Sequence, residues 1–303
     1  MIHLIGNPTR DHIVNGPKSV RAFGGTVLYA GLFLARSGHE VTIIGKGDED
    51  MEKWIEYQGI LTTHFHQTCR IVEFDNVYVK NQREQFARYG EKIYLSEVPD
   101  AAFRSEAILI GSVLQEVDPE IVRAPRQALL MLEAQGFMRH LAPDGKVLHC
   151  TCSDAETAVR YCDILKVDQS EAAVLTATTE ADTAARVLHK MGPKIVIITS
   201  GENGVTIFDG SRMIRIRAPA AEVVDPTGAG DVFGAAFLIR YLQTEDLIQA
   251  GLFASAAAAL SMAEFGTAAV PSAQEASRSV KKLFKDPDTV SIGFPAADFQ
   301  YIA

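Results

Sequence analysis

Short apolar runs alternate along this chain with longer segments in which apolar residues recur every three or four positions. Runs rich in valine and isoleucine are typical of strands buried on both faces. We expect such strands at Ile2–Ile5, Val41–Ile44, Ala107–Ile110, Ala128–Leu132, Ile164–Val167 and Lys194–Thr199. The periodic segments predict helices at Arg21–Ser37, Ser170–Thr176, Glu180–Met191, Asp231–Leu242, Thr244–Phe265 and Ala273–Phe284. This alternation predicts an α/β fold, with a central, mostly parallel sheet flanked by helices.

One segment, from Thr62 to Tyr89, has no helical period. Its short β-type runs predict a small antiparallel sheet, with strands at Thr62–His66, Cys69–Phe74, Val77–Lys80 and Gln85–Tyr89. We therefore expect a single domain, residues 1–303, into which residues 62–89 insert as a β lid that covers a cleft. A plain insertion hairpin is the alternative interpretation.

A glycine-rich turn follows a predicted edge hairpin, Gly204–Phe208 and Met213–Arg217, and a further strand that ends at Val224. The turn reads Asp225-Pro226-Thr227-Gly228-Ala229-Gly230-Asp231 and leads into a helix. Glycines let the backbone approach a ligand, and successive amides at a helix N-terminus bind an anion. A carboxylate beside such a site, here Asp231, fits phosphoryl transfer, because it can accept the proton of the attacking hydroxyl.

Two other interpretations of this turn remain open. Asp231 can be an ordinary acid in the first turn of a helix, where the macrodipole favours negative charge. The glycines can also belong to a dinucleotide-binding turn, although Gly228-x-Gly230-x-x-x-Gly234 is one residue longer than the G-x-G-x-x-G spacing.

The residues from Asp225 to Phe233 resemble the C-terminal signature of the ribokinase-like (PfkB) carbohydrate kinases, D-T-G-A-G-D-x-F, with Pro226 as an additional residue. The resemblance implies a ribokinase-like fold and an enzyme that transfers the γ-phosphoryl group of ATP to a substrate hydroxyl. It also implies that Asp231 is the catalytic base and that Gly228, Ala229 and Gly230 form the anion hole.

Further landmarks resemble the substrate side of that family. Asp11 corresponds to the carboxylate that binds substrate hydroxyls, and Gly24-Gly25 corresponds to its di-glycine substrate turn. Gln135 and Arg139 lie in a stretch similar to D-x-Q-G-[FYW]-x-R, which occurs in a branch that includes myo-inositol kinases. The resemblance therefore favours a sugar, a cyclitol such as myo-inositol or a related polyol as substrate. A nucleoside kinase and a non-catalytic ligand-binding relative are the alternatives.

The nucleotide side shows a second set of resemblances. Thr199, Gly201 and Gly204 match the family's T-x-G-x-x-G nucleotide turn, and Ala257 lies in an alanine-rich run that resembles the helix beside adenine. Glu171, three residues after Asp168, resembles the glutamate that organises Mg²⁺ and its waters. A capping acid at a helix N-terminus is the alternative role for Glu171, and tight helix packing is the alternative for Ala257.

Composition and charge narrow the class of partners. The chain has 29 Lys and Arg against 38 Asp and Glu, a net charge of −9, which disfavours binding to nucleic acid. Its apolar runs are shorter than the roughly 20 residues of a membrane span. Four cysteines in 303 residues make no disulfide framework, so we expect a cytoplasmic protein. The expected partner is a small-molecule substrate, and edge strands of the lid could pair in a homodimer.

Overall fold

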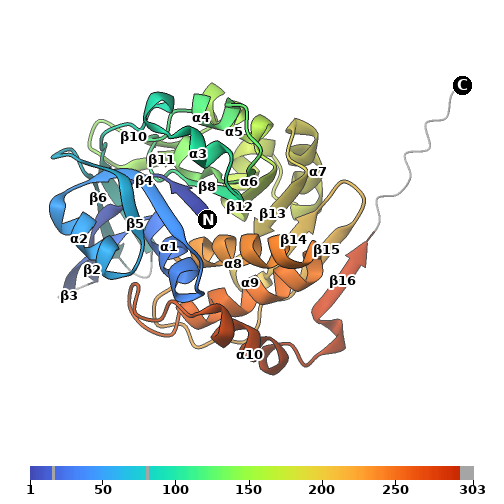
Figure 1. The fold of residues 1–303 in the computed structure, drawn as a ribbon. Coiled ribbons are helices and arrows are strands. Elements are labelled where there is room, and N and C mark those ends of the chain that lie inside the picture. Colours follow the sequence, from blue (N-terminus) through green and yellow to red (C-terminus); the bar gives the residue numbers. More distant parts are fainter. Residues whose placement is uncertain (16–17, 80–81, 294–303) are drawn as a thin grey trace, which may run out of the picture.

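The computed structural model describes residues 1–15, 18–79 and 82–293, and its largest element is a twisted sheet (Figure 1). The described strands of this sheet follow the order β16-β15-β14-β13-β12-β9-β8-β1-β4-β5. Neighbours from β13 to β5 pair in parallel, whereas β14, β15 and β16 extend the sheet by antiparallel pairing. The bounds are β1 Ile2–Ile5, β4 Val41–Gly47, β5 Leu61–Gln67, β8 Ala107–Gly111, β9 Leu129–Glu133, β12 Ile164–Asp168, β13 Ile195–Thr199, β14 Val205–Phe208, β15 Met213–Ile216 and β16 Val290–Gly293.

Helices cover both faces of the sheet, as expected for an α/β fold (Figure 1). One face carries α1 (Thr26–Arg36), α8 (Ala229–Thr244), α9 (Leu247–Ser261) and α10 (Ala273–Leu283). The other carries α3 (Asp100–Phe103), α4 (Glu120–Arg123), α5 (Ser153–Tyr161), α6 (Gln169–Thr176) and α7 (Ala181–Met191). Each face of the sheet has its own hydrophobic core, and alternate residues of β8 point into one or the other. Leu109 lies in the core beneath the first group of helices, and Ile108 and Ile110 lie in the core beneath the second. The predicted α/β fold with a central sheet is confirmed.

A second, smaller sheet lies at the left of Figure 1 and consists of β3, β2, β6 and β7, in that order, among the described residues. We call it the small sheet. Strands β2 and β6 pair in parallel, and the other two pairings are antiparallel. Val72, Phe74 and Ala87 of this sheet pack on Val113 and Leu114, which follow β8. The bounds are β2 Thr9–Asn15, β3 Lys18–Gly24, β6 Val72–Val79 and β7 Gln82–Arg88.

The predicted extent of the lid, residues 62–89, is wrong at its N-terminal end. The segment Thr62–His66 lies within β5, which pairs with β4 in the main sheet. The small sheet instead takes two strands from residues 9–24, because β2 is inserted between β3 and β6. The break between the predicted strands Cys69–Phe74 and Val77–Lys80 is also wrong, since β6 runs through residues 75–76 without interruption. Lys80, the last residue of one predicted strand, lies outside the described residues.

Three predicted elements differ in their bounds or kind. The helix expected at Arg21–Ser37 starts only at Thr26, because Lys18–Gly24 pairs with β2 and Gly25 has a φ of 93°. The helix expected at Thr244–Phe265 is α9, Leu247–Ser261, because Glu245 has a left-handed backbone and Asp246 caps the new helix. The strand expected to end at Val224 is absent from the described elements. That segment is a loop whose backbone bonds to Met262.

The remaining described elements are short or lie beside the small sheet. They are α2 (Glu49–Tyr57), the hairpin β10 (Arg139–Leu141) and β11 (Val147–His149), and the 3-10 helices η1 (Leu95–Glu97), η2 (Ala134–Met138), η3 (Gly201–Asn203) and η4 (Pro287–Thr289). Among the described residues, no helix combines the length and apolar character needed to cross a membrane.

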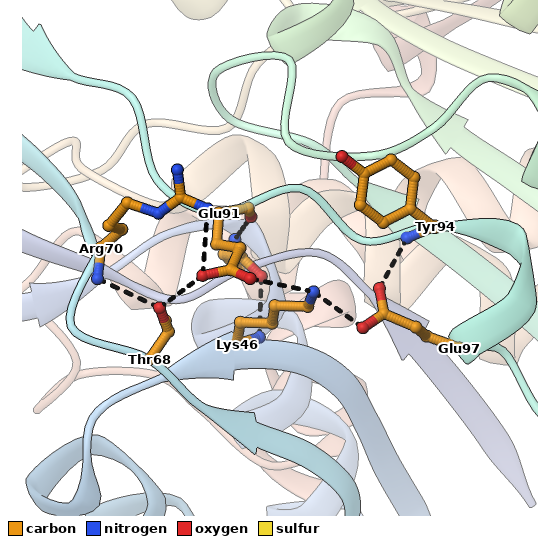
Figure 2. Close-up of polar contacts among 7 residues, drawn as sticks. Lys46, Thr68, Arg70, Glu91, Tyr94 and Glu97 are labelled. Atoms are coloured by element: carbon orange, nitrogen blue, oxygen red, sulfur yellow. Dashed lines mark hydrogen bonds and ion pairs between the residues drawn. The ribbon is translucent and has the colours of Figure 1, made fainter.

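A polar cluster joins the small sheet to the main sheet (Figure 2). We call it the Lys46 cluster, and its members are Lys46, Thr68, Arg70, Glu91, Tyr94 and Glu97. Lys46, near the end of β4, places Nζ 2.8 Å from Glu97 Oε1 and 3.8 Å from Glu91 Oε1. Thr68 and Arg70 lead into β6, and Glu91 follows β7. The segment that leads into β6 and the segment that follows β7 therefore both contribute to the network around the buried Lys46 ammonium.

Candidate active site

Asp231 lies in the first turn of α8, at the edge of the main sheet where the parallel strands end. The Thr26 hydroxyl donates a 2.9 Å hydrogen bond to Asp231 Oδ1. The Gln135 amide in turn donates a 2.9 Å bond to the Thr26 oxygen. Three segments far apart in sequence thus fix the orientation of one carboxylate.

The glycine turn, Gly228–Gly230, has a backbone that other residues would not tolerate well. Gly228 has a φ of 76°, and a Cβ on it would lie 2.2 Å from the Tyr29 ring. The turn leads directly into α8, whose first amides have no carbonyl partner within the helix. Such amides form an anion site at a helix N-terminus. The structure therefore places the amides of a helix N-terminus beside the Asp231 carboxylate, and the Ala229 amide donates a 3.3 Å bond to the Pro226 carbonyl.

Two buried charges lie behind the glycine turn. Lys166, on β12, donates a short hydrogen bond to Glu133 Oε2, at the end of β9. A Cβ on Gly230 would lie 3.3 Å from Lys166 Nζ, so the ammonium abuts the turn. Burial raises the pKa of Glu133, although the Lys166 ammonium opposes this shift. Burial disfavours the charge of Lys166, but the carboxylates of Glu133 and Asp231 outweigh it and raise the pKa of Lys166.

Asp231 is partly buried, and removal from water raises the pKa of its carboxyl above the ordinary value. The charge of Lys166, the Thr26 hydrogen bond and the charge of Arg139 oppose this effect. A carboxylate with a raised pKa is a stronger base than an exposed one, which suits a group that must accept a proton. Tyr29 packs among the carboxylates of Asp11, Asp225 and Asp231, and burial together with these charges raises the pKa of its hydroxyl.

The predicted substrate residues of the small sheet lie together. Asp11 Oδ1 accepts a 2.7 Å hydrogen bond from the Thr9 hydroxyl. A Cβ on Gly24 would lie 2.4 Å from Asp11 Oδ2, so Gly24 makes room for this carboxylate. Gly25, with a φ of 93°, turns the chain from β3 into α1, which carries Thr26. The two glycines thus link two parts of the site. Gly24 lies against Asp11, and Gly25 is followed by Thr26, which bonds to Asp231.

A cavity of about 610 Å³ opens along the inner side of the small sheet. Asp11 lines it, together with Phe23, Phe74 and Trp54. The Phe23 and Trp54 rings meet edge to face, with centroids 5.8 Å apart. Asp231 is outside this lining, so the cavity extends outward from Asp11 rather than over the glycine turn.

The structure brings both residues of the Gln135–Arg139 stretch to the same region. Gln135 bonds to Thr26, as described above, and Arg139 Nη1 donates a 3.3 Å bond to the Val113 carbonyl. The Arg139 guanidinium lies over the Phe74 ring of the small sheet, 5.7 Å from its centroid. Arg139 therefore lies where the small sheet approaches the main sheet.

The predicted metal residue, Glu171, has a structural role in the described chain. It forms a reciprocal capping box with Asp168 at the start of α6, with bonds of 2.8 Å in each direction. Burial, reinforced by the nearby Asp168 charge, raises the pKa of Glu171 to about 7. Among the described residues there is no group of three or more His, Cys, Asp or Glu side chains arranged to hold a metal ion. Two adjacent carboxylates nevertheless suit a Mg²⁺ ion that keeps its water shell.

The predicted nucleotide residues are divided by the structure. Thr199, at the end of β13, pairs in register with Asp168, next to the Glu171 capping box. Gly201 and Gly204 form the turn after it, and a Cβ on Gly204 would lie 2.0 Å from the Ile216 carbonyl oxygen. Ala257 belongs to α9 and is fully buried on the side of the helix that faces the core. The turn that contains Gly201 and Gly204 therefore lies at the end of β13, next to Asp168 and Glu171, whereas Ala257 lies in the hydrophobic core.

Sequence reasoning missed Thr26, Lys166 and Glu133. The one available signal was a lysine inside the apolar run of β12 and a glutamate at the end of the apolar run of β9. Charged residues in strands that are buried on both faces need partners. That requirement marks both positions but does not pair them, because 33 residues separate Glu133 from Lys166.

A glycine turn at a helix N-terminus that ends in a partly buried carboxylate, at the carboxyl edge of an α/β sheet, is an arrangement suited to a phosphotransferase. The model of the pfkB family of carbohydrate kinases matches residues 1–274, and the chain belongs to this family. Members of this family are carbohydrate kinases, which transfer a phosphoryl group to an alcohol group, and relatives of the chain include a ribokinase and a nucleoside kinase.

Curated relatives agree with the family. A ribokinase of Haemophilus influenzae is 24% identical over 299 residues, which cover 90% of this chain and 95% of the relative. A cytidine kinase of Thermococcus kodakarensis is 38% identical over 95 residues, and a nucleoside kinase of Methanothermobacter thermautotrophicus is 39% identical over 124 residues. These two matches cover 30% and 41% of this chain but only 34% and 39% of the relatives' own lengths.

Solved structures show the same fold. A pyrophosphate-dependent kinase of the ribokinase family, complexed with a pyrophosphate analogue and myo-inositol, superposes with a TM-score of 0.80. It is 26% identical, and the match covers 92% of this chain and all of that structure. The ribokinase of Arabidopsis thaliana, complexed with ribose and ATP, gives a TM-score of 0.76 at 19% identity, over 92% of this chain and 98% of its own.

Proposed function

We propose that this protein is an ATP-dependent kinase that phosphorylates a hydroxyl of a sugar, a cyclitol such as myo-inositol or a related polyol. The observation that carries the proposal is the Asp231 carboxylate, partly buried and oriented by Thr26 beside the glycine turn. A protein that only bound its ligand would have no need for a base at that position. The relative solved with myo-inositol supports a cyclitol acceptor.

In the proposed reaction, Asp11 binds hydroxyls of the acceptor, and Gln135 and Arg139 help to position it. Thr26 holds Asp231 Oδ1, so Oδ2 faces the attacking hydroxyl and takes its proton. The acceptor oxygen bonds to the γ-phosphorus while the bond from that phosphorus to the β-phosphate oxygen breaks, and ADP leaves. The amides of Gly228, Ala229 and Gly230 stabilise the charge on the transferred group.

Thr199, Gly201 and Gly204 are the residues that we assign to the nucleotide, because their turn ends a strand next to α6. We assign Ala257 only to the packing that supports that side. Glu171 would hold Mg²⁺ through the waters of the ion, and bound Mg²⁺ would neutralise the donor phosphates. The net charge of −9 then poses no obstacle, because neutralisation is local.

A nucleoside acceptor is the second candidate, and one observation favours it. The cavity beside Asp11 carries the aromatic side chains of Phe23 and Trp54, which can contact a base while Asp11 binds the ribose. The partial matches to a cytidine kinase and a nucleoside kinase point the same way.

A transfer assay tests the proposal. The protein would be incubated with ATP, or with pyrophosphate in parallel, and with separate panels of cyclitols, sugars and nucleosides. Mass spectrometry would then detect an acceptor that has gained a phosphoryl group. We expect transfer from ATP to one class of polyol. Transfer from pyrophosphate alone would correct the donor, and transfer to nucleosides alone would select the second candidate. Binding of acceptor without transfer from either donor would contradict the proposal.

A further inference from the structure

The proposed reaction leaves two charged side chains next to Asp231 without a role, Lys166 and Glu133. They form a buried hydrogen-bonded pair in which the lysine side chain is 7% exposed and the glutamate side chain 4% exposed. Removing charges from water is unfavourable, and an apolar pair of similar size can stabilise a core equally well or better. The position of this pair therefore calls for an explanation other than stability.

The pair lies directly behind the reacting groups. Lys166 Nζ abuts Gly230, where a Cβ would lie 3.3 Å away, and Glu133 Oε1 occupies the space that a Cβ on Gly234 would need, 2.1 Å away. Gly230 belongs to the glycine turn, and Gly234 lies one helical turn further along α8. Two glycines of α8 thus admit the two charges to the N-terminal end of the helix that carries Asp231.

We propose that Lys166, held by Glu133, is a positioning residue for phosphoryl transfer, whose ammonium balances the negative charge of Asp231 from behind the glycine turn. The inference rests on the proposed function, because it presupposes that Asp231 is the base. It adds a residue to which neither the sequence motif nor the mechanism above gives any part in the reaction.

The charged groups that face Asp231 come from several elements. Lys166 on β12 and Arg139 at the start of β10 are positive, and both lower the pKa of Asp231 against the effect of burial. Glu133 on β9 is a nearby acid whose pKa Asp231 raises in turn, and Glu171 on α6 raises the pKa of both Glu133 and Lys166. Thr26 and Tyr29 of α1 contribute a hydrogen bond and a neutral hydroxyl. Lys166 is therefore one of two cations that act on this carboxylate.

A second observation sets the pair apart from a purely structural ion pair. Glu133 Oε1 is buried without a hydrogen-bond partner among the described residues. Buried polar atoms are nearly always satisfied, and exceptions concentrate where function requires them. Within the described chain, Lys166 Nζ donates to the other oxygen of Glu133 and also abuts Gly230 of the glycine turn.

The experiment measures kcat/KM against pH for the wild type and for Lys166→Met and Lys166→Gln. Loss of the ammonium should make Asp231 harder to ionise. The acid limb of the profile should therefore move upward by about one pH unit, and kcat near neutrality should fall about tenfold to a hundredfold. The KM for the acceptor should change less than about threefold, because Lys166 is placed behind the turn rather than in the acceptor cavity.

Three control variants separate charge from packing. Lys166→Arg keeps a positive charge, and Glu133→Gln keeps an oxygen that can accept from Lys166, so neither should move the acid limb upward. Lys46→Met removes a second lysine that is buried and bonded to a glutamate among the described residues, and it should leave the limb in place. Thermal unfolding of each variant reports whether it folds, and Lys166→Gln, which can still donate to Glu133, serves if Lys166→Met does not.

The possible outcomes distinguish the inference from the function on which it rests. An acid limb that stays at its wild-type position in both neutral Lys166 variants would overturn the inference while leaving Asp231 as the base. An upward shift of equal size in Lys46→Met would also overturn it, because the effect would then not be local. Full activity of Asp231→Asn would instead overturn the proposed function itself.

Discussion

Two buried lysines lie in parallel strands of the main sheet, and the contrast between them separates a structural site from a reacting one. Lys46 of β4 and Lys166 of β12 are both bonded to a glutamate, and both side chains are almost fully buried, 6% and 7% exposed. They differ in how completely their partners are satisfied and in what lies in front of each ammonium.

The carboxylates around Lys46 have many donors. Glu91 accepts from the Thr68 hydroxyl and pairs with Arg70, and these contacts, with Lys46, lower its pKa. Partial burial opposes ionisation of Glu97, but Lys46 and the Tyr94 amide outweigh it and lower the pKa of Glu97 as well (Figure 2). Such a network fixes the connections of the small sheet.

The carboxylate beside Lys166 has the opposite character. Glu133 is buried, one of its oxygens is unpartnered among the described residues, and its pKa is raised. Ions held with few partners are unfavourable for stability and common at functional sites. A buried lysine and its glutamate partners therefore stabilise the fold at Lys46, whereas at Lys166 we assign the same two residue types to the proposed reaction.

The largest effect on kcat should come from a side chain added to the glycine turn next to Lys166. Gly228→Ala would bring a methyl group 2.2 Å from the Tyr29 ring and force a residue other than glycine into a left-handed backbone. Displaced amides should lower kcat about a hundredfold or more. The matched control is Gly59→Ala, because Gly59 also has a positive φ, 78°, but has open space around it. If the Gly228 variant turned over as fast as the Gly59 variant, the anion-hole assignment would be wrong.

An intermediate effect is expected at Lys46. Lys46→Met removes the ammonium on which Glu91 and Glu97 converge, and we expect the free energy of unfolding to fall by about 1 to 2 kcal/mol. Urea unfolding measures it, and the Glu97→Gln and double variants complete a cycle that isolates the Lys46–Glu97 coupling. A coupling near zero would remove the structural half of the comparison.

Acceptor binding should respond at Gly24. Gly24→Ala would place a methyl group 2.4 Å from Asp11 Oδ2 and displace this carboxylate. We expect the KM for the acceptor to rise about tenfold, with a smaller change in kcat, because Asp11 binds the acceptor but does not take its proton. Steady-state kinetics at several acceptor concentrations checks this. An unchanged KM would remove Asp11 from the acceptor site.

The smallest effect concerns stability against pH. The raised pKa of Glu133 in the folded protein means that the folded state binds a proton that the unfolded state has already lost. This contribution is complete below the ordinary value of 4.5 and is lost as the pH rises through the folded pKa. From about pH 5 to about pH 8 the thermal midpoint of the wild type should therefore fall relative to that of Glu133→Gln. If the midpoints of the two proteins changed in parallel with pH, Glu133 would not keep its proton in the folded protein over this range.

The sequence predicted the central strands well, because a strand buried on both faces has a one-dimensional apolar signature. It did not predict the small sheet correctly. Strand β2 reads Thr-Arg-Asp-His-Ile-Val-Asn, too polar for that signature, and its pairing with β6 joins residues about sixty positions apart. Only tertiary pairing reveals that Thr9–Asn15 is a strand and that Lys18–Gly24 is not helical.

The candidate site divides in the same way. Asp231 and the glycine turn are adjacent in sequence, so a local motif was enough to predict them. Thr26, Glu133 and Lys166 reach Asp231 from three other elements, and nothing local in the sequence links them. Glu171 was predicted as a metal residue and is found in a capping box, a role that its spacing from Asp168 allows equally.

The central claim is that Asp231 is the base of a phosphoryl transfer, and the most direct measurement is the turnover of Asp231→Asn with ATP and the best acceptor. Asparagine has nearly the same shape and can still accept from Thr26, so folding and ATP binding should stay close to those of the wild type. The account predicts that kcat falls by about a thousandfold or more, with an unchanged thermal midpoint. Turnover close to that of the wild type would contradict the account.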